Sequence, residues 1–275
     1  MAQSGDFNFG SDNVAAAYDT ILVPLIFEPW AESLLGEHPD WEGRTVLDLA
    51  TGTGIVAQLA ARRVGPTGRV IATDLNPEML ERARQRCSDS TSRVEFSKAE
   101  GHAIAADAES IDIVLCQQGF QFFNDLDATA NEISRVLRPG GSILASTWAP
   151  ADECAFFGWI CQTLAEVGEP ELEAIMRLPF DHMPPENLSA PFLQAGFTHV
   201  SVERQSAPLL VTGGTAAVLE AADATPIGPK LVELPQPKRE AFEATLRRRV
   251  ESERIDETTM GDLSAHVLKA SKPAA

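Results

Sequence analysis

The fold of this chain is decided by the stretch Val46-Leu47-Asp48-Leu49-Ala50-Thr51-Gly52-Thr53-Gly54-Ile55-Val56-Ala57. An apolar run ends in an acid, a glycine-rich turn follows, and a segment compatible with a helix comes next. This pattern predicts a buried strand whose carboxyl end reaches a ligand. Gly52 and Gly54 let the backbone turn tightly and approach that ligand without a Cβ atom in between. The helix that follows would offer unpaired N–H donors to a negatively charged group.

The same turn also satisfies the loose dinucleotide-binding fingerprint, because Ala57 completes it and Asp74 lies at a distance suited to a ribose. Both interpretations imply a cofactor that contains a nucleoside. Asp48 separates them, since a carboxylate before the glycines would repel a pyrophosphate but suits a cofactor that carries an ammonium group. S-adenosylmethionine has that group in its amino-acid tail. We therefore favour a methyltransferase, and an NAD(P)-dependent oxidoreductase stays open as the alternative.

Strands and helices alternate along most of the chain, after an interrupted amphipathic segment at residues 11–36 that predicts two or three short helices. We expect strands at 44–49, 69–73, 94–97, 111–116 and 142–148, and helices at 55–64, 77–87 and 126–137. This rhythm predicts an α/β fold with a doubly wound, mostly parallel sheet and its ligand at the carboxyl strand ends. Beyond residue 150 we expect helices at 153–167, 184–195, 215–222 and 237–254, and strands at 197–204 and 265–269.

The order of these elements suggests three parts within one domain. Residues 1–40 would form an N-terminal helical lid, and residues 41–150 the cofactor-binding core. Residues 151–275 would add a helical cap and the last strands to the same domain. We find no internal repeat and no low-complexity linker that would divide the chain further.

Composition limits the partners of the chain. Its 40 acidic and 22 basic residues give a net charge of −18, which would repel the phosphate backbone of a nucleic acid. No apolar run is long enough for a membrane span, and the N-terminus has no secretory signal pattern. The four cysteines show no metal-binding spacing. We expect a cytoplasmic protein with reduced cysteines, no metal, no nucleic-acid partner and a small-molecule substrate; a homodimer is left open.

Three motifs follow one another at a specific spacing. They are Val46–Gly54, then Val70–Leu80 with a strand-end acid and a helix that Asn76 would cap, then the turn Arg135–Gly141. Together they resemble the class I S-adenosylmethionine-dependent methyltransferases, in particular the branch of ubiquinone/menaquinone C-methyltransferases and small-molecule enzymes. The resemblance covers about residues 40–150. It implies a seven-stranded Rossmann-like sheet with an antiparallel last strand, and methyl transfer by in-line displacement.

The resemblance also implies a set of cofactor contacts. Asp74 would accept the ribose hydroxyls, Leu75 and Met79 would flank the adenine, and Asp48 would lie beside the methionine tail. Lys98 stands where the family usually has an acid that meets the adenine amino group, and Ala50 replaces the first glycine of the motif. The cofactor-binding candidates are Asp48, Ala50, Gly52, Gly54, Asp74, Leu75, Met79, Ala99, Glu100 and Gln117.

The acceptor candidates follow the fourth predicted strand, in the segment Gln117–Phe123. Amides there can hydrogen-bond a hydroxyl or a carbonyl without adding charge, and phenylalanines can stack on an aromatic ring or anchor the next helix. The catalytic candidates are Gln118 and His102, whose imidazole suits acid/base chemistry or a structural hydrogen bond. The apolar run Phe156–Ile160 either lines an acceptor pocket or forms core. We expect a small aromatic or apolar acceptor, and a cofactor-binding protein without catalysis stays open.

Overall fold

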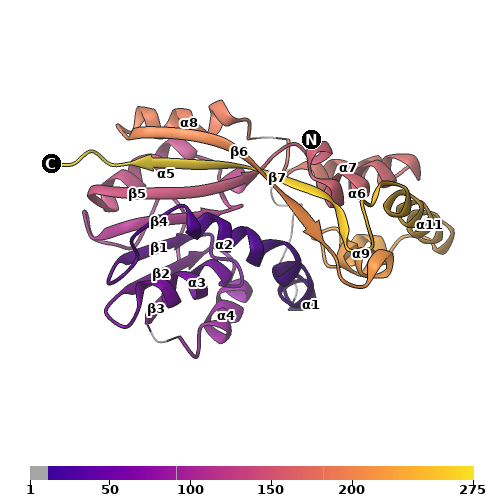
Figure 1. The fold of residues 1–275 in the computed structure, drawn as a ribbon, viewed down its shortest axis with the longest axis horizontal. Helices are drawn as coiled ribbons and strands as arrows, with labels where there is room; N and C mark the ends of the chain where they lie inside the picture. The colour runs from indigo at the N-terminus through magenta and orange to yellow at the C-terminus, as the bar shows by residue number, and fades with distance from the viewer. Residues whose placement is uncertain (1–11, 91, 182) are drawn as a thin grey trace. The chain divides into compact units, whose positions relative to one another are not determined.

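The structure, a computed structural model, describes residues 12–90, 92–181 and 183–275 (Figure 1). Seven strands of the described residues form one sheet: β1 (Thr45–Leu49), β2 (Arg69–Asp74), β3 (Arg93–Lys98), β4 (Ile111–Gln117), β5 (Leu137–Trp148), β6 (Thr198–Leu210) and β7 (Thr259–Ser271). Their order across the sheet is β3-β2-β1-β4-β5-β7-β6. The α/β prediction with a seven-stranded sheet is therefore confirmed.

Strands β1 to β5 form the parallel part of the sheet. β1 pairs in parallel with both β2 and β4, and the outer pairs β2–β3 and β4–β5 are also parallel. The strand order reverses between β1 and β4, and in such sheets the ligand crevice lies at the carboxyl ends of those two strands. The loops that follow β1 and β4 therefore meet at one edge of the sheet.

β7 runs antiparallel to both of its neighbours. As residue numbers rise along β5 or β6, the numbers of their β7 partners fall. The hydrogen-bonded pairs that show this are Gly141–Lys272 and Ala149–Ser264 for β5, and Thr198–Ser271 and Val211–Thr258 for β6. The predicted antiparallel last strand is confirmed.

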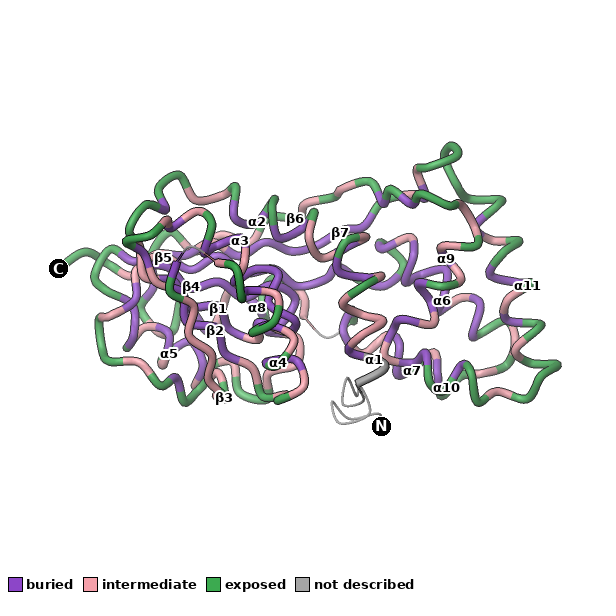
Figure 2. The backbone as a smooth tube through the Cα atoms, turned by 90° about the horizontal axis from the view of Figure 1, so that it is seen from below, coloured by how far each residue is buried: buried purple, intermediate pink, exposed green. Residues whose placement is uncertain are grey.

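The helices of the parallel region lie in two groups. One group contains α2 (Glu28–Gly36), α3 (Ile55–Val64) and α4 (Pro77–Arg86). In this group α3 packs against α2, α4 and strands β1 to β3, and α4 also packs against β2 and β3. The other group contains α5 (Leu126–Val136) and α8 (Pro185–Gln194), which pack together. Side chains from α5 and α8 join Leu47, Val114 and Leu268 in one hydrophobic cluster. Figure 2 shows the central strands as buried. The central strands of the parallel sheet are thus buried under packed helices.

The described residues form two compact units. The sheet unit consists of residues 28–147, 183–204 and 266–275, and the helical unit of the described part of 1–27 with 148–182 and 205–265. The helical unit contains α1 (Asp12–Ala17), a π-helix (Tyr18–Phe27), α6 (Ala155–Glu166), α7 (Pro170–Arg177), α9 (Gly214–Asp223), α10 (Gly228–Val232) and α11 (Gln236–Glu253). The predicted boundaries at residues 40 and 150 stay predictions, and residues 1–11 of the expected lid lie outside the described residues.

The aromatic run Phe156–Ile160 lies in α6, and its side chains are buried. The ring of Phe157 lies 4.7 Å from that of Phe180 and 5.6 Å from that of Trp148. A Cβ atom at Gly158 would lie 2.8 Å from the carbonyl oxygen of Ala151, so α6 packs closely there. These contacts support the interpretation of this run as the core of the helical unit.

Two further expectations concern the surface and the cysteines. None of the helices in the described part of the chain has both the length and the apolarity that a membrane crossing requires. The four cysteines all lie in described segments, are buried, and form no disulfide with one another.

Candidate functional site

The loop after β1 has an unusual backbone. Ala50, Gly52 and Gly54 all have positive φ angles, of 55°, 55° and 88°. A Cβ atom at Gly54 would lie 2.8 Å from the Cα atom of Ala83, so the loop packs directly on α4. At Gly52 a Cβ atom would meet no described atom within 4 Å. At Gly52 the backbone of the loop is therefore not covered by a side chain of its own or by neighbouring atoms, which suits the close approach of a ligand.

Asp48 lies directly beneath this loop and is 1% exposed. Its Oδ2 accepts a hydrogen bond of 2.6 Å from the Thr51 hydroxyl, while its Oδ1 has no hydrogen-bond partner among the described residues. Burial raises the pKa of Asp48 to about 7; the charge of Asp74 adds to this, and the Thr51 hydroxyl and the Ala57 N–H oppose it. A buried carboxylate oxygen without a partner costs free energy, so a cationic or donor group of a ligand would be favoured there.

Asp74 ends β2. It connects α4 to the loop after β1, residues 50–54, which we call the glycine loop. Its Oδ2 accepts a hydrogen bond of 2.9 Å from the Gly52 N–H, and its Oδ1 accepts one of 2.9 Å from the Asn76 N–H. Burial raises the pKa of Asp74 and these backbone donors lower it. Each carboxylate oxygen can accept more than one hydrogen bond, so Asp74 can hold the loop and still accept two hydroxyls. The sequence did not predict the first of these roles.

The carboxyl end of α4 also holds the glycine loop. Arg86 donates from Nε to the carbonyl oxygen of Thr53 over 3.0 Å, and Gln58 of α3 donates to the carbonyl oxygen of Arg86 over 2.9 Å. At the other end of α4, the Asn76 side chain accepts from the N–H groups of Glu78 and Met79. The predicted cap at Asn76 is confirmed. Helix α4 thus holds the glycine loop at its carboxyl end and begins directly after Asp74 and Asn76 at its amino end.

The remaining residues proposed to flank the adenine lie in different environments. Leu75 is 53% exposed, whereas Met79 is buried in α4 with 4% exposure. The Ala99 N–H donates to the carbonyl oxygen of Asp74 over 3.3 Å, which brings the loop after β3 beside the end of β2. Glu100 lies on the same loop, and its Oε2 lies 2.9 Å from Nε2 of His102, both side chains being about half exposed. Their assigned roles stay predictions.

The loop after β4 is buried and strained. Gln117 and Gln118 are 9% and 6% exposed, and Gln118 has a φ of 51°. The Gln118 N–H donates to the carbonyl oxygen of Ser146 over 2.8 Å. Neither Nε2 nor Oε1 of the Gln118 amide has a hydrogen-bond partner among the described residues. An amide in this state can bind a ligand that supplies the missing partners.

The phenylalanines after Gln118 secure this loop. Phe120 is fully buried, and its ring lies 5.4 Å from that of Phe123 in an edge-on arrangement. A Cβ atom at Gly101 would lie 2.2 Å from the Phe123 ring, so this ring packs against the loop after β3. Phe123 therefore anchors the segment, while Phe122 is half-buried. The alternative that at least one of Phe122 and Phe123 has an anchoring role is thus supported.

These contacts bring most of the predicted residues to the carboxyl edge of the sheet. Asp48, Gly52 and Asp74 are linked through the glycine loop. The loop after β4 joins them because a Cβ atom at Gly119 would lie 2.9 Å from the Cβ of Ala50. The sequence missed Arg86 and Gln58, and only the side-by-side placement of α3 and α4 reveals them.

The chain is similar in sequence and in fold to known methyltransferases. Residues 46–141 match the family described as methyltransferase domain. The chain is 35% identical over 138 residues to the ubiquinone/menaquinone biosynthesis C-methyltransferase UbiE of Hahella chejuensis, covering 48% of this chain and 55% of that protein. It is 40% identical over 106 residues to the arsenite methyltransferase of Halobacterium salinarum, covering 38% of this chain and 27% of that protein. The chain thus spans about half, or less, of the curated relatives that it matches.

A solved structure extends the similarity to the whole fold. The phosphoethanolamine N-methyltransferase 2 of Haemonchus contortus, in complex with phosphomonomethylethanolamine and S-adenosylhomocysteine, superposes with a TM-score of 0.64. The superposition covers 99% of this chain and 61% of that chain, at 18% sequence identity. At this identity the likeness concerns the Rossmann-like fold alone.

Proposed function

We infer from residues 46–141, which match the methyltransferase domain family, that the chain binds S-adenosylmethionine and transfers its methyl group to a small molecule. The observation that carries this proposal is the buried Oδ1 of Asp48, which has no partner among the described residues. It lies at the strand end beside a loop of bare backbone. An ammonium group would satisfy this oxygen, whereas a pyrophosphate would be repelled by it.

The other residues fit the same cofactor. Asp74 has the acceptor capacity for two ribose hydroxyls after its bonds to Gly52 and Asn76. Leu75 is exposed beside it and offers apolar surface to an adenine ring. Hydrogen bonds to a charged acceptor such as Asp74 contribute about 1.5–3 kcal/mol each. We assign Asp48, Ala50, Gly52 and Gly54 to the methionine tail, and Leu75, Met79, Ala99, Glu100 and Gln117 to the rest of the cofactor.

The bound cofactor would supply a methyl group on a sulfonium, which is already activated for displacement. The chain then has to align the acceptor and exclude water, which is the larger part of catalysis in such a displacement. A general base is needed only when the acceptor arrives protonated. His102 is the candidate for that role, and Gln118 is the candidate for orienting the acceptor.

For the acceptor we propose a small aromatic or apolar molecule. The half-buried Phe122 and the uncharged amides beside it support this assignment, since aromatic rings stack and amides bind neutral polar groups. The cytoplasmic location expected from the sequence stays a prediction, and the homodimer stays open.

Calorimetric titration with S-adenosylhomocysteine, and with NADH in parallel, tests the cofactor. We expect micromolar binding of the first and none of the second, while binding of NADH alone would make the oxidoreductase the leading hypothesis.

Asp74→Ala should weaken S-adenosylhomocysteine binding by roughly tenfold or more because charge-assisted bonds are lost. Asp89→Ala, at an exposed acid beyond the end of α4, is the matched control. Affinity unchanged in Asp74→Ala would remove the ribose assignment, and acceptor turnover distinguishes an enzyme from a cofactor-binding protein.

A further inference from the structure

We propose that the Gln118 side chain selects the acceptor, by pairing with a neutral group that holds a hydrogen-bond donor next to an acceptor. A lactam, a carboxamide or a hydroxyl beside a carbonyl has this arrangement. The inference rests on the proposed function and specifies its substrate class.

The first support is the state of the amide itself. Gln118 is 6% exposed, and both its Nε2 and its Oε1 are buried without a partner in the described chain. Each buried polar group without a partner costs roughly 1–3 kcal/mol. Native structures keep few such groups, and those they keep call for an explanation. A ligand that supplies both partners explains this one.

The second support is the backbone. Gln118 has a φ of 51°, a conformation that costs a residue with a Cβ atom about 1–2 kcal/mol. The bond from its N–H to the Ser146 carbonyl oxygen (2.8 Å) holds it there. The next residue, Gly119, leaves no room for adjustment, because a Cβ atom would lie 2.7 Å from Cys116 Sγ. Strain of this kind, fixed by surrounding packing, is typical of sites that bind or react.

The third support is the absence of charge at this strand end. The segments 117–123 and 146–147 contain no ionisable side chain. Oxygen atoms of three neutral side chains there, namely Gln121, Ser146 and Thr147, are also buried without a partner among the described residues. A phosphate or a carboxylate would find no cation in these segments. A neutral polar acceptor fits them best.

The chemistry of the amide then defines the complementary group. A glutamine side chain offers N–H donors and a carbonyl acceptor side by side in one plane. A partner with an adjacent acceptor and donor satisfies both at once. A molecule that lacks the donor would leave Oε1 buried and unpaired, which corresponds to a loss of roughly tenfold or more in affinity.

The test uses the full chain saturated with S-adenosylhomocysteine and three probes. These are 2-quinolone, which has a lactam N–H beside its carbonyl, 1-methyl-2-quinolone, which lacks that donor, and phosphoethanolamine, which is charged. We expect calorimetry to show 2-quinolone binding at least about tenfold tighter than its methylated analogue, and no binding of phosphoethanolamine. Equal binding of the two quinolones, binding of phosphoethanolamine, or no binding of any probe would overturn the proposal.

The variant Gln118→Leu provides a second test, with one readout that uses the probes and two that do not. It should abolish the preference for 2-quinolone, leave S-adenosylhomocysteine affinity within about twofold, and raise the melting temperature of the ligand-free chain, because an unpaired buried amide is removed. Gln194→Leu, at the exposed end of α8, is the control. A fall in melting temperature, or a loss of S-adenosylhomocysteine binding in Gln118→Leu alone, would assign the amide to the scaffold or the cofactor instead. Absence of S-adenosylhomocysteine binding in the unmodified chain would refute the proposed function and this inference with it.

Discussion

At Asp48 a single carboxyl group connects protonation with stability. Its folded pKa of about 7 lies above the ordinary value of 3.8, because it is buried. Between these two values the folded chain holds a proton that the unfolded chain has lost, so stability falls as pH rises through this window and stays lower above it. Asp48→Asn keeps an oxygen to accept from Thr51 but cannot ionise.

We therefore expect Asp48→Asn to gain stability relative to the unmodified chain when pH is raised from about 4.5 to about 8. The melting temperatures of the variant and the unmodified chain, measured at both pH values, test this prediction. A melting-temperature difference between the two proteins that stays the same at both pH values would contradict it. Cofactor binding should depend on pH in the opposite direction from folding stability, because an ammonium group of the cofactor favours the ionised carboxylate of Asp48. Affinity for S-adenosylhomocysteine should rise with pH up to about 7 in the unmodified chain and stay flat in the variant.

Ala50 and Gly119 show how two neighbouring loops constrain each other. Ala50 replaces the usual glycine despite a φ of 55°, and its Cβ would lie 2.9 Å from a Cβ at Gly119. Gly119→Ala should lower the free energy of unfolding by about 1–3 kcal/mol through overpacking.

The double variant Ala50→Gly/Gly119→Ala should recover part of this loss, because one of the two close contacts is removed. The other, to Cys116 Sγ at 2.7 Å, remains. Denaturant unfolding of both single variants and the double variant gives the coupling free energy. Strictly additive effects would show that the two loops do not restrain each other.

Single residues differ in how far the sequence predicts them. Asp48 and Asp74 could be located because Asp74 ends one buried strand and Asp48 lies one residue before the end of another, and strand ends carry ligands in this kind of sheet. The unpartnered amide of Gln118 could not, since it depends on a left-handed backbone that no local pattern requires. His102 could be placed on its loop, but not its contact with Glu100, which depends on the course of that loop.

Among the elements, those with buried apolar faces were predicted best. Helix α3 begins and ends at the predicted residues, and β1, β2 and β4 differ from prediction by one residue at one end. Strands β6 and β7 extend several residues beyond prediction, and much of β6 is exposed, so its outer residues carry no apolar signal. Helices α7 and α10 were not predicted; they have 8 and 5 residues, too few for a clear periodicity.

The start of β5 was misjudged for a different reason. Pro139-Gly140-Gly141 predicted a turn, but the strand already begins at Leu137 and contains these residues. The pairing of β4 with β5 is irregular between Ile111 and Ile113, and Gly140 has a φ of 77°. The glycines therefore form an irregularity within the strand, which a sequence pattern does not distinguish from a turn.

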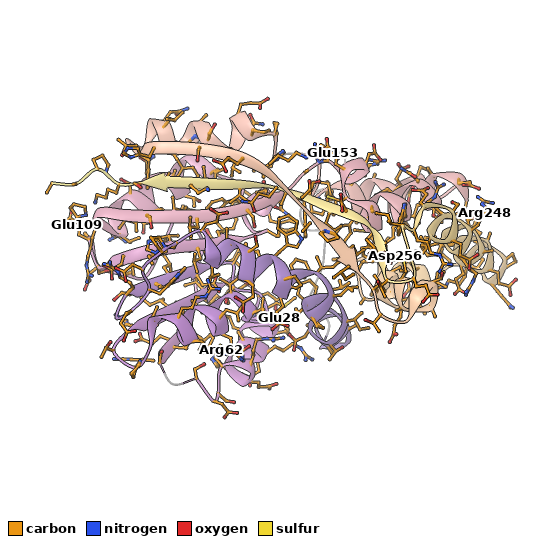
Figure 3. All side chains as sticks on the ribbon, viewed as in Figure 1. Glu28, Arg62, Glu109, Glu153, Arg248 and Asp256 are labelled. Carbon is orange, nitrogen blue, oxygen red and sulfur yellow. The ribbon has the colours of Figure 1, made fainter. Side chains whose placement is uncertain are left out.

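Helix α4 has a positioning role that can be tested at its carboxyl end. Arg86 holds the Thr53 carbonyl oxygen and does not itself lie at the strand ends. Arg86→Met should weaken S-adenosylhomocysteine binding roughly threefold to tenfold, since one charge-assisted hydrogen bond to the loop is lost. Arg62→Met, at an exposed arginine on α3 (Figure 3), should leave it unchanged.

Partial rescue by Arg86→Lys, which keeps a donor, would support a role in positioning the loop. Lysine has a single donor centre and a different reach, so complete rescue is not expected. Equal losses in Arg86→Met and Arg62→Met would instead indicate a general electrostatic effect of removing a positive charge.

The net charge of −18 acts on the molecule as a whole. Acids outnumber its basic residues, and exposed ion pairs such as Arg84–Glu81 and Arg248–Glu166 lie on its surface. Exposed pairs of this kind contribute only about 0–1 kcal/mol each. Repulsion among the excess acids opposes the compact state. Salt weakens both the attraction and the repulsion, and the large excess of acids over basic residues makes the repulsion the larger effect.

We therefore expect the melting temperature to rise as sodium chloride is raised from about 0.02 M to about 0.5 M, since the Debye length falls well below 10 Å over this range. Calorimetric scans at fixed pH measure the shift, and an equal osmolarity of sucrose separates screening from preferential exclusion. Neutralising an exposed acid such as Glu257, in Glu257→Gln, should stabilise the chain at low salt and lose that effect at high salt. A melting temperature that falls with salt would mean that the ion pairs, rather than the repulsion, dominate the surface electrostatics of the folded chain.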